Sequence, residues 1–323
     1  MQPDEGLFTR QLPGDRFREQ TDPVLQLENI NVSFDGFRAL TDLSLAIGVG
    51  ELRCVIGPNG AGKTTIMKML LGLTAPTSGT VSIFGRPLKG NEKRVLPRIG
   101  SLIESPGFYP NLTGTENLQI FARLRGLKSP NYIKGALELV NLPYRDKKRY
   151  AQYSLGMKQR LGIAIALAGD PDFLVLDEPV NGLDPQGIVE MRELILKLNR
   201  ERQITVLISS HILDELSRLA THYGIIDNGR MVKELSAEEL DAACRKCVRM
   251  EVSDTAVLAR VLDAMNLEYK IISATTADVF AKINVTQLTV ALAKENCEVL
   301  SMQEKDESLE SYYISLVGGG SNA

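Results

Sequence analysis

The amino-acid sequence predicts an α/β protein with a parallel sheet, followed by a smaller α+β domain. Strand-like and helix-like segments alternate over residues 24–235, which is the order that builds a parallel sheet. The segment "DFLVLDEP" is short and continuously apolar, as expected for a strand that is covered on both faces. After about Leu235 this order changes. The 323 residues are enough for about two domains.

The first strands of the predicted sheet surround a glycine-rich turn. "VLQLENINVSF" alternates apolar and polar residues like a half-buried strand, and "GFRALTDLSLAIG" follows as a second strand. "ELRCVIGPNGAGKTTIMKMLLGL" is typical of a strand, a turn and an amphipathic helix, and "GTVSIFG" of a further strand. Residues from about 104 to 160 are mostly helical in pattern, with "TGTENLQIFARLRGL" and "NYIKGALELVNL" as the clearest helices. We therefore expect a helical subdomain inserted into the core.

The α/β order resumes with "DFLVLDEP" and continues to about Leu235. "QGIVEMRELILKLNRE" predicts a helix, "ITVLISS" a strand, "HILDELSRLA" a helix and "YGIIDNGRMV" a hairpin. Beyond it, the segments "KCVRMEVS", "TAVLARVLDAM", "EYKIIS", "DVFAKIN", "TQLTVALAKEN" and "EVLSMQ" have the order β-α-β-β-α-β. This is the split-βαβ, ferredoxin-like arrangement. "ESLESYYISLV" predicts a last helix.

Composition is ordinary for a globular protein in water. Apolar residues make up 44% of the chain, charged residues 24%, and the net charge is −3, so no overall basic field argues for nucleic acid. No apolar run approaches the roughly 18 residues that cross a bilayer. The first 22 residues are polar and do not resemble a secretory signal. We therefore expect a cytosolic protein that works at a membrane only if something else anchors it.

The cysteines and one of the two histidines carry no evident chemistry. Cys244 and Cys247 form a C-x-x-C pair, but no second pair and no nearby histidine accompany it. A tetrahedral zinc site would lack ligands, so we interpret these cysteines as reduced thiols. His222 has no functional context and is expected to be structural.

A complete phosphate-binding motif follows the third predicted strand. "GPNGAGKT" matches G-x-x-x-x-G-K-[ST] and lies between an apolar strand and a helix. Glycines let successive N–H groups face an anion, and the helix presents its positive N-terminal end to the same phosphate. Lys63 adds a charge at the β- and γ-phosphates, and Thr64 offers a hydroxyl to Mg²⁺. A glycine-rich turn without a ligand would need neither residue. The residues expected to bind nucleotide here are Gly57, Pro58, Asn59, Gly60, Ala61, Gly62, Lys63, Thr64 and Thr65.

Acidic residues and a histidine follow two other predicted strands. Asp177 ends "FLVLD", where its carboxylate can hold Mg²⁺ directly or through water, and Glu178 comes next. A carboxylate near the γ-phosphate can act as general base for the attacking water. A solvated acidic turn is the alternative interpretation of this pair. His211 follows "ITVLISS" at the same predicted sheet edge, so it is a candidate γ-phosphate contact, although a lone histidine is more often structural.

Five motifs together resemble a known family. "GPNGAGKTT", "YSLGMKQR", "FLVLDEP", "NGLDP" and "SSH" occur in the order found in the ATP-binding subunits of ABC transporters. "YSLGM" resembles the family's signature, usually Leu-Ser-Gly-Gly-Gln: Ser154 and Gly156 keep the functional positions, whereas Leu155 and Met157 depart from them. The resemblance implies an ABC-type P-loop NTPase core. The domains expected are a flexible arm at 1–22, the nucleotide-binding domain at 23–235 with its helical subdomain at about 104–160, an accessory α+β domain at 236–317 and a flexible tail at 318–323.

The family implies how such a chain works. Two ATP-binding domains pack head to tail, and each ATP with its Mg²⁺ lies between one P-loop and the other subunit's signature helix. Ser154 would cap that helix and point at a γ-phosphate held by the partner, so hydrolysis would loosen the dimer. We expect a homodimer that drives a separate membrane permease from the cytoplasmic face of the cell membrane. Phe34 matches the residue that stacks on adenine, Asp184 belongs to the loop that crosses the dimer interface, and His211 matches the switch histidine. A core strand aromatic is the alternative for Phe34.

One departure from the family pattern points to a subfamily. Where the family commonly has glutamine, this chain has Glu104, which can ligate Mg²⁺ and would need Mg²⁺ or a proton beside the γ-phosphate. With "ESPGFYPNLTGTENL" and "YSLGMKQRLGIA", the chain looks most like subunits that serve bacitracin resistance and lantibiotic immunity, which move antimicrobial peptides away from the membrane. The segment at about 104–125 is where the family docks its permease. Phe108, Tyr109 and Leu112 are candidate groove residues, with local core packing as the alternative.

Two rival functions share some of these motifs. An ABC-type ATPase acting on ribosomes or DNA would share the motifs. Translation-type members usually join two nucleotide domains, whereas this chain has one P-loop, and DNA-repair relatives insert a long coiled coil that is missing here. A P-loop phosphotransferase for a small molecule would have no use for the signature motif.

Overall fold

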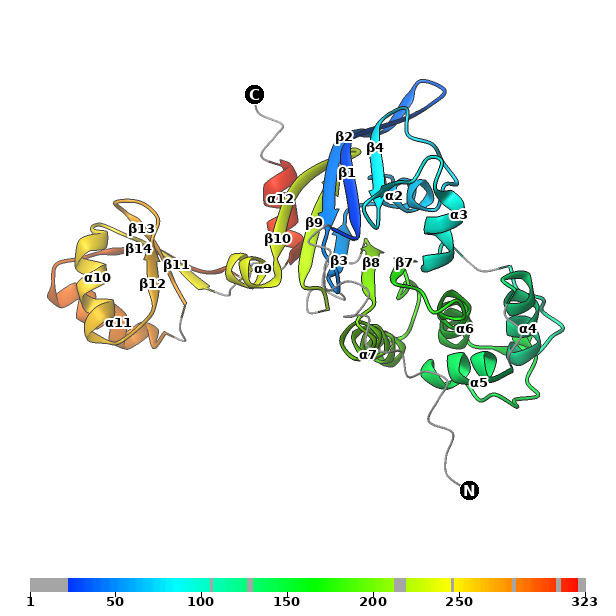
Figure 1. Ribbon diagram of the computed structural model, residues 1–323. Coiled ribbons are helices and arrows are strands. Elements are labelled where there is room, and N and C mark those ends of the chain that lie inside the picture. The colour runs from blue at the N-terminus through cyan, green and yellow to red at the C-terminus, as the bar shows by residue number, and fades with distance from the viewer. Residues whose placement is uncertain are drawn as a thin grey trace. The chain divides into compact units, whose positions relative to one another are not determined.

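The computed structural model describes residues 23–104, 107–126, 130–211, 219–244, 247–280, 283–305 and 309–318 (Figure 1). The chain divides into two compact units, residues 1–237 and 238–323. The predicted N-terminal arm, most of the predicted helix "HILDELSRLA" and residues 319–323 of the predicted tail lie outside the described residues. Gly318, the first residue of that predicted tail, is the last residue of a helix instead.

A mostly parallel sheet forms the centre of the first unit. Its strand order is β10-β9-β3-β8-β7-β6. The strands are β3 (Leu52–Ile56), β6 (Ile99–Leu102), β7 (Phe173–Asp177), β8 (Thr205–Ser210), β9 (His222–Asp227) and β10 (Arg230–Ser236). All neighbours from β9 to β6 run parallel, and only β10 is antiparallel. The carboxyl ends of β3, β8 and β7 therefore lie side by side, which places the residues that follow these strands at one edge.

An antiparallel sheet covers the other side of helix α2 (Lys63–Leu70). Its order is β2-β1-β4-β5, with β1 (Leu25–Phe34), β2 (Phe37–Ile47), β4 (Ser78–Ile83) and β5 (Arg86–Pro87). One buried apolar cluster joins side chains of this sheet to Ile66 and Met69 of α2 and to Val175 and Leu207 of the parallel sheet. The helix that follows the phosphate loop is thus fixed between two sheets.

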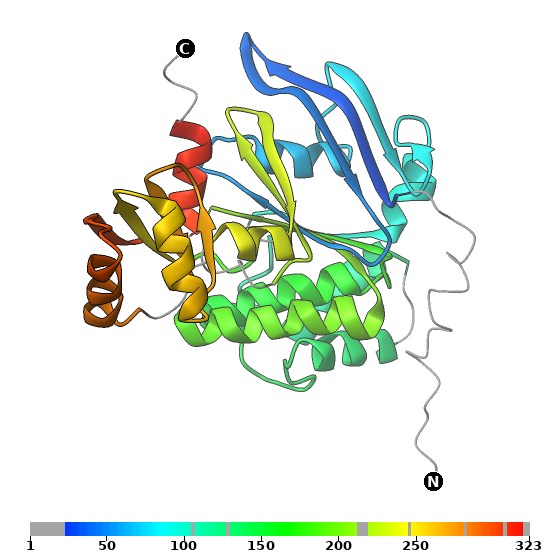
Figure 2. The same cartoon turned by 90° about the vertical axis from the view of Figure 1, so that its left-hand side faces the viewer.

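The helical region contains α4 (Gly114–Leu124), α5 (Pro130–Leu139) and α6 (Leu155–Leu167). Thr113 caps α4 in a capping box with Glu116, which satisfies N–H groups at the start of that helix. Asn117 is fully buried and bonds the backbone of Tyr109 in both directions, at 2.8 and 3.1 Å. Helix α6 runs beside α7 (Pro185–Arg202) (Figure 2), and Arg160 forms an ion pair with Glu190 across them.

Some short elements were not predicted. Strand β6, the short helices α3 (Glu92–Val95) and α9 (Ala237–Ala243), and strand β5 are each too short for a clear period in the sequence. No helix in the described ranges is long and apolar enough to span a membrane.

The second unit contains an antiparallel sheet with order β12-β13-β11-β14. Its elements are β11 (Cys247–Val252), α10 (Thr255–Ala264), β12 (Tyr269–Ile271), β13 (Thr276–Val279), α11 (Val285–Lys294), β14 (Val299–Lys305) and α12 (Leu309–Gly318). Strand β13 begins before the predicted "DVFAKIN", because residues from Thr276 pair with β11. Met250, Leu258 and Leu292 contribute to a core between the sheet and helices α10 and α11.

Candidate functional site

The loop from β3 to α2 has the backbone that a phosphate cradle needs. Gly60 and Gly62 adopt φ angles of 83° and 107°, which favour glycine. A Cβ added at Gly57 would lie 2.3 Å from the carbonyl oxygen of Ile226, and one at Gly62 would lie 2.6 Å from Leu40 Cδ2. No side chain caps α2, so the positive N-terminal end of this helix opens onto the loop. The observed geometry requires glycine at both crowded positions.

Lys63 lies at the centre of this loop. Its side chain is 5% exposed, and Nζ donates hydrogen bonds to the carbonyl oxygens of Gly57 at 2.7 Å and Pro58 at 3.0 Å. The same ammonium lies 3.5 Å from Oε1 of Glu178. The loop's own carbonyls therefore hold a buried cation opposite the acid that follows β7.

Thr64 and Asp177 meet across the sheet edge. Thr64 Oγ1 donates to Asp177 Oδ2 at 2.8 Å, and Ser209 Oγ donates to Asp177 Oδ1. The backbone N–H of Glu178 donates to Ser209 Oγ at 2.9 Å. A hydroxyl and a carboxylate are the hard oxygen ligands that suit Mg²⁺. Ser209 was not predicted as a site residue, although a polar residue at the end of an apolar strand was a usable signal.

Glu178 has two differently placed oxygens. Oε2 accepts a hydrogen bond from Asn181 Nδ2 at 3.1 Å and lies 3.0 Å from His211 Nδ1, whereas Oε1 faces Lys63. The residue adopts φ 48°, a conformation that a non-glycine residue rarely takes and that is common at functional sites. Two neighbours thus anchor one oxygen and leave the other directed at the loop.

The turn before α6 is a separate feature of the surface. Ser154 caps the helix by accepting from Met157 N at 3.3 Å, and its side chain is exposed. A Cβ added at Gly156 would meet only Leu183 Cδ2, at an ordinary 3.7 Å. Within the described residues, no recorded hydrogen bond joins Ser154 to residues 57–65. Packing against the described residues of this chain therefore does not explain the glycine at 156.

A short loop connects the acid to this turn. Leu155 is 45% exposed, and its Cδ2 packs close to Gly182, where an added Cβ would lie 3.1 Å away. Asn181, which bonds Glu178, begins the same loop. Asp184 ends it as the N-cap of α7, accepting from Gly187 N at 3.2 Å. In this structure Asp184 is a helix cap.

Two predicted nucleotide residues lie apart from the cluster. Phe34 ends β1 with 46% of its surface exposed and pairs with Phe37, which is 65% exposed, so Phe34 is not a core residue.

Glu104 adopts φ 58° and accepts a hydrogen bond from Lys68 Nζ at 2.8 Å, with its side chain 65% exposed. The structure thus brings together Lys63, Thr64, Asp177, Glu178 and His211.

An apolar groove of about 470 Å³ lies between the parallel sheet and the helical region. Residues that line it include Leu71, Leu73, Ile103, Phe108, Leu124 and Arg125. Phe108 is only 8% exposed and stacks edge-on against Phe121, so core packing accounts for it, whereas Tyr109 is 53% exposed and Leu112 is half-buried. Burial lowers the pKa of the Arg125 guanidinium.

Comparisons with known proteins give a consistent result. The family model described as "ABC transporter" matches residues 40–181. The chain is 40% identical over 302 residues to a bacitracin transport ATP-binding protein BcrA of Enterococcus faecalis, covering 92% of this chain and 97% of that one. It is 44% identical over 211 residues to the lantibiotic transport ATP-binding protein SrtF of Streptococcus pyogenes, covering 65% of this chain and 90% of that one.

Solved structures agree with these relatives. CbiO1 of Clostridium perfringens, described as part of the ABC transporter complex cbiONQ, superposes with a TM-score of 0.63 and 26% identity, covering 76% of this chain and 96% of that one. The ATP-binding cassette MJ0796, solved as a dimer in a post-hydrolysis state with ADP and Pi, superposes with a TM-score of 0.60 and 25% identity, covering 66% and 98%.

Proposed function

This chain belongs to the family of ABC transporter ATP-binding proteins and is an ATPase of that family, and we propose that it pairs with a second copy of itself around two Mg·ATP to drive a separate membrane permease. The observation that carries the proposal is the separation of two phosphate-binding features. The Lys63 loop and the exposed Ser154 turn have no recorded hydrogen bond between them in the described part of the chain. In such a pair, each chain contributes the Lys63 loop to one ATP site and the Ser154 turn to the other.

The loop residues bind and orient the triphosphate. Lys63 exchanges its bonds to Gly57 and Pro58 for phosphate oxygens, and the first N–H groups of α2 bind the same anion. Thr64 and Asp177 have the oxygen donors and the spacing that fit Mg²⁺. Bound Mg²⁺ supplies neutralisation of charge on the β- and γ-phosphates. Exposed Phe34 is available to stack on adenine.

Glu178 activates the attacking water. Asn181 and His211 hold Oε2, whereas Oε1 lies 3.5 Å from Lys63 Nζ on the side of the phosphate loop. Once Lys63 binds phosphate, Oε1 is the oxygen placed to accept the water's proton. The proton moves from water to Oε1 as the water oxygen attacks the γ-phosphorus and the β–γ bridging bond breaks. His211, beside the same carboxylate, is placed to contact the γ-phosphate.

The Ser154 turn completes the site of the partner copy. Its hydroxyl, the N-terminal end of α6 and the small Gly156 together suit an anion that approaches closely. The dimeric MJ0796 structure, which contains ADP and Pi, supports this arrangement by family likeness. Loss of the γ-phosphate removes the shared anion and loosens the pair.

The apolar groove is the proposed docking site of the permease. Leu73 and Leu124, which line the groove, are 68% and 78% exposed, which is unusual for apolar side chains on a surface that stays in water. Membership of cbiO1 in a transporter complex supports a partner of this kind. The bacitracin and lantibiotic relatives support export of antimicrobial peptides, with this chain on the cytoplasmic side of the membrane.

The second unit is proposed to be a ferredoxin-like accessory domain. Its β-α-β-β-α-β order and the sheet order β12-β13-β11-β14 support that topology. The two helices that pack on one face of its sheet give it a core of its own.

Light scattering on the full chain tests the pairing. Glu178→Gln with Mg·ATP should form a stable dimer, whereas the same variant with ADP should stay monomeric. Adding Ser154→Ala to Glu178→Gln should weaken the dimer without changing the fold. A monomer under every nucleotide condition would contradict the proposal.

A second experiment tests the groove. The wild-type chain should capture the permease, and Leu124→Asp should not.

A further inference from the structure

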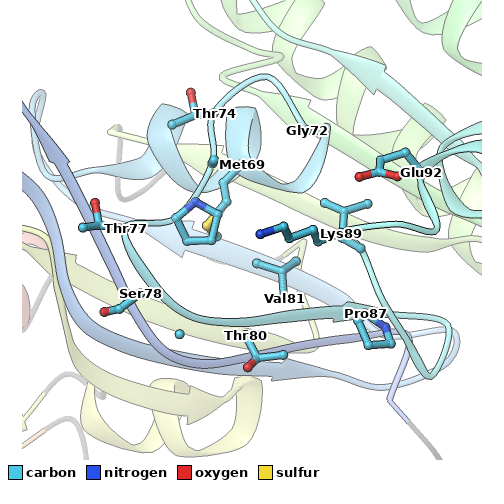
Figure 3. A pocket seen from close by; sticks show the side chains of 14 residues that line it. Met69, Gly72, Thr74, Thr77, Ser78, Thr80, Val81, Pro87, Lys89 and Glu92 are labelled. Atoms are coloured by element: carbon cyan, nitrogen blue, oxygen red, sulfur yellow. The ribbon is translucent and has the colours of Figure 1, made fainter.

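We propose that a hollow between α2, β4 and the segment 86–92 binds the headgroup of an anionic membrane phospholipid, with Lys89 as its central cation. The hollow has a volume of about 530 Å³. Its wall includes Met69, Thr74, Thr80, Val81, Lys89 and Glu92 (Figure 3). None of these residues belongs to the ATP site described above, so the hollow is a separate feature of the first unit.

Lys89 makes the hollow suited to an anion. Figure 3 shows its amine directed into the hollow, between Met69 and Val81. No ion pair or hydrogen bond is recorded for this ammonium among the residues that the structure describes. Met69 and Val81 are 1% and 7% exposed, so they form an apolar floor beside the charge. Lys89 itself is exposed, so an anion from solvent or from a membrane surface can reach its ammonium directly.

The surroundings of Lys89 are basic, although the whole chain carries a net charge of −3. Arg86, Lys93 and Arg94 are exposed on β5 and α3. Glu92 is the only carboxylate between residues 86 and 94, and it accepts a hydrogen bond from Gly90 N at 3.0 Å. This cluster of cations, which we call the 86–94 basic segment, complements the negative surface of a membrane's inner leaflet.

The hollow shares a short stretch of chain with the proposed permease groove. Leu71 and Leu73 line the groove, whereas Gly72 and Thr74 line the hollow. A permease seated in the groove is embedded in the membrane, so it would hold the 86–94 basic segment near the lipid headgroups. This step rests on the proposed function.

Vesicle flotation of the full chain, without permease or nucleotide, tests the inference. The chain should bind vesicles of phosphatidylglycerol in phosphatidylcholine and not vesicles of phosphatidylcholine alone. One basic residue near an anionic surface contributes about fivefold to binding through diffuse charge. Lys93→Gln should therefore lower the bound-to-free ratio by up to about fivefold, whereas Lys89→Gln should lower it by clearly more, because Lys89 lines the hollow and Lys93 does not. Lys197→Gln, an exposed lysine on α7, should leave it unchanged.

Four results would overturn the inference. Equal binding to both kinds of vesicle would mean that anionic lipid is not recognised, and equal losses in Lys89→Gln and Lys93→Gln would mean that only diffuse charge acts. Equal binding by Lys89→Gln and Lys197→Gln would mean that the hollow is not used. Release of the chain by inorganic phosphate at the concentration of the anionic phospholipid would mean that free phosphate is the ligand. Basal ATPase activity of Lys89→Gln should match the wild type.

The same variants separate this inference from the proposed function. Leu124→Asp should lose permease capture and keep vesicle binding, because Leu124 lines the groove and not the hollow. If the chain captures the permease but does not bind vesicles, only the proposed lipid site is contradicted. If it binds vesicles but does not capture the permease, only the proposed permease site is contradicted.

Discussion

The side-chain amide of Asn181 donates a hydrogen bond to Oε2 of Glu178 at 3.1 Å. This oxygen also lies 3.0 Å from His211, so Oε1 alone is left facing Lys63. Asn181 begins the loop whose Gly182 packs against Leu155, next to the Ser154 turn. The proposed general base of one site and the proposed phosphate contact for the other are therefore connected through four consecutive residues, 181–184.

Asn181 is expected to position Glu178 without touching nucleotide. Asn181→Ala should lower kcat for ATP hydrolysis about tenfold, the effect of one lost hydrogen bond, and leave KM within about twofold. Steady-state kinetics measure both values. Asn199→Ala removes a buried asparagine far from Glu178 that bonds Gly50 O, and it serves as a control for general destabilisation. Equal losses in kcat for the two variants, or a raised KM alone in Asn181→Ala, would argue against positioning.

Lys63 and Lys68 provide a matched pair of lysines on one helix. Lys63 lies in the phosphate loop, whereas Lys68 pairs with exposed Glu104. Lys63→Ala should weaken ATP binding about 10- to 100-fold, because a buried charge-assisted contact is lost. Lys68→Ala should change it less than about threefold, because exposed ion pairs contribute little. Calorimetric titration with Mg·ATP measures both, and unchanged affinity in Lys63→Ala would contradict the cradle.

Gly57 is expected to be needed for folding, whereas Gly156 is expected to be needed for dimerisation. Gly57→Ala should destabilise the chain, because the added Cβ would lie 2.3 Å from Ile226 O. Gly156→Ala should stabilise it by up to about 1 kcal/mol, because alanine is the better helix former and the added Cβ would make only an ordinary 3.7 Å contact with Leu183. Even so, Gly156→Ala should reduce ATP-driven dimerisation of Glu178→Gln. Denaturant unfolding and light scattering test the pair. If Gly156→Ala leaves ATP-driven dimerisation unchanged, the partner's nucleotide does not approach Gly156 closely.

Cys54 gives a prediction about alkaline pH. It is fully buried in β3, and burial raises the pKa of its thiol from 9.0 to about 12, an effect that nearby Lys63 partly offsets. The folded state thus favours the neutral thiol. Its contribution to stability is complete below about pH 9 and is lost as the pH rises toward about 12, at about 1.4 kcal/mol per pH unit. Denaturant midpoints of wild type and Cys54→Ala should converge above about pH 9. A constant difference would contradict the shift.

Local motifs allowed the phosphate loop, Asp177 and Glu178 to be placed on predicted elements, because the loop and its flanking strand and helix are contiguous in sequence. Contacts between distant strands were harder to predict. Ser209 meets Asp177 only because β7 and β8 pair in that register. Asn181 was missed because the left-handed φ of Glu178, at 48°, folds the chain back onto its own carboxylate. The contact between Glu104 and Lys68 was also not predicted, because it joins a helix to a loop 36 residues away.

In the proposed dimer, two chains share each terminal phosphate. A crystal or cryo-EM structure of Glu178→Gln with Mg·ATP distinguishes this arrangement from a site built within one chain. We expect a head-to-tail dimer in which Ser154 Oγ of one protomer lies about 3 Å from the γ-phosphate bound at the Lys63 loop of the other. A bound triphosphate with Ser154 turned away from it in every protomer, or a nucleotide-filled monomer, would contradict the account.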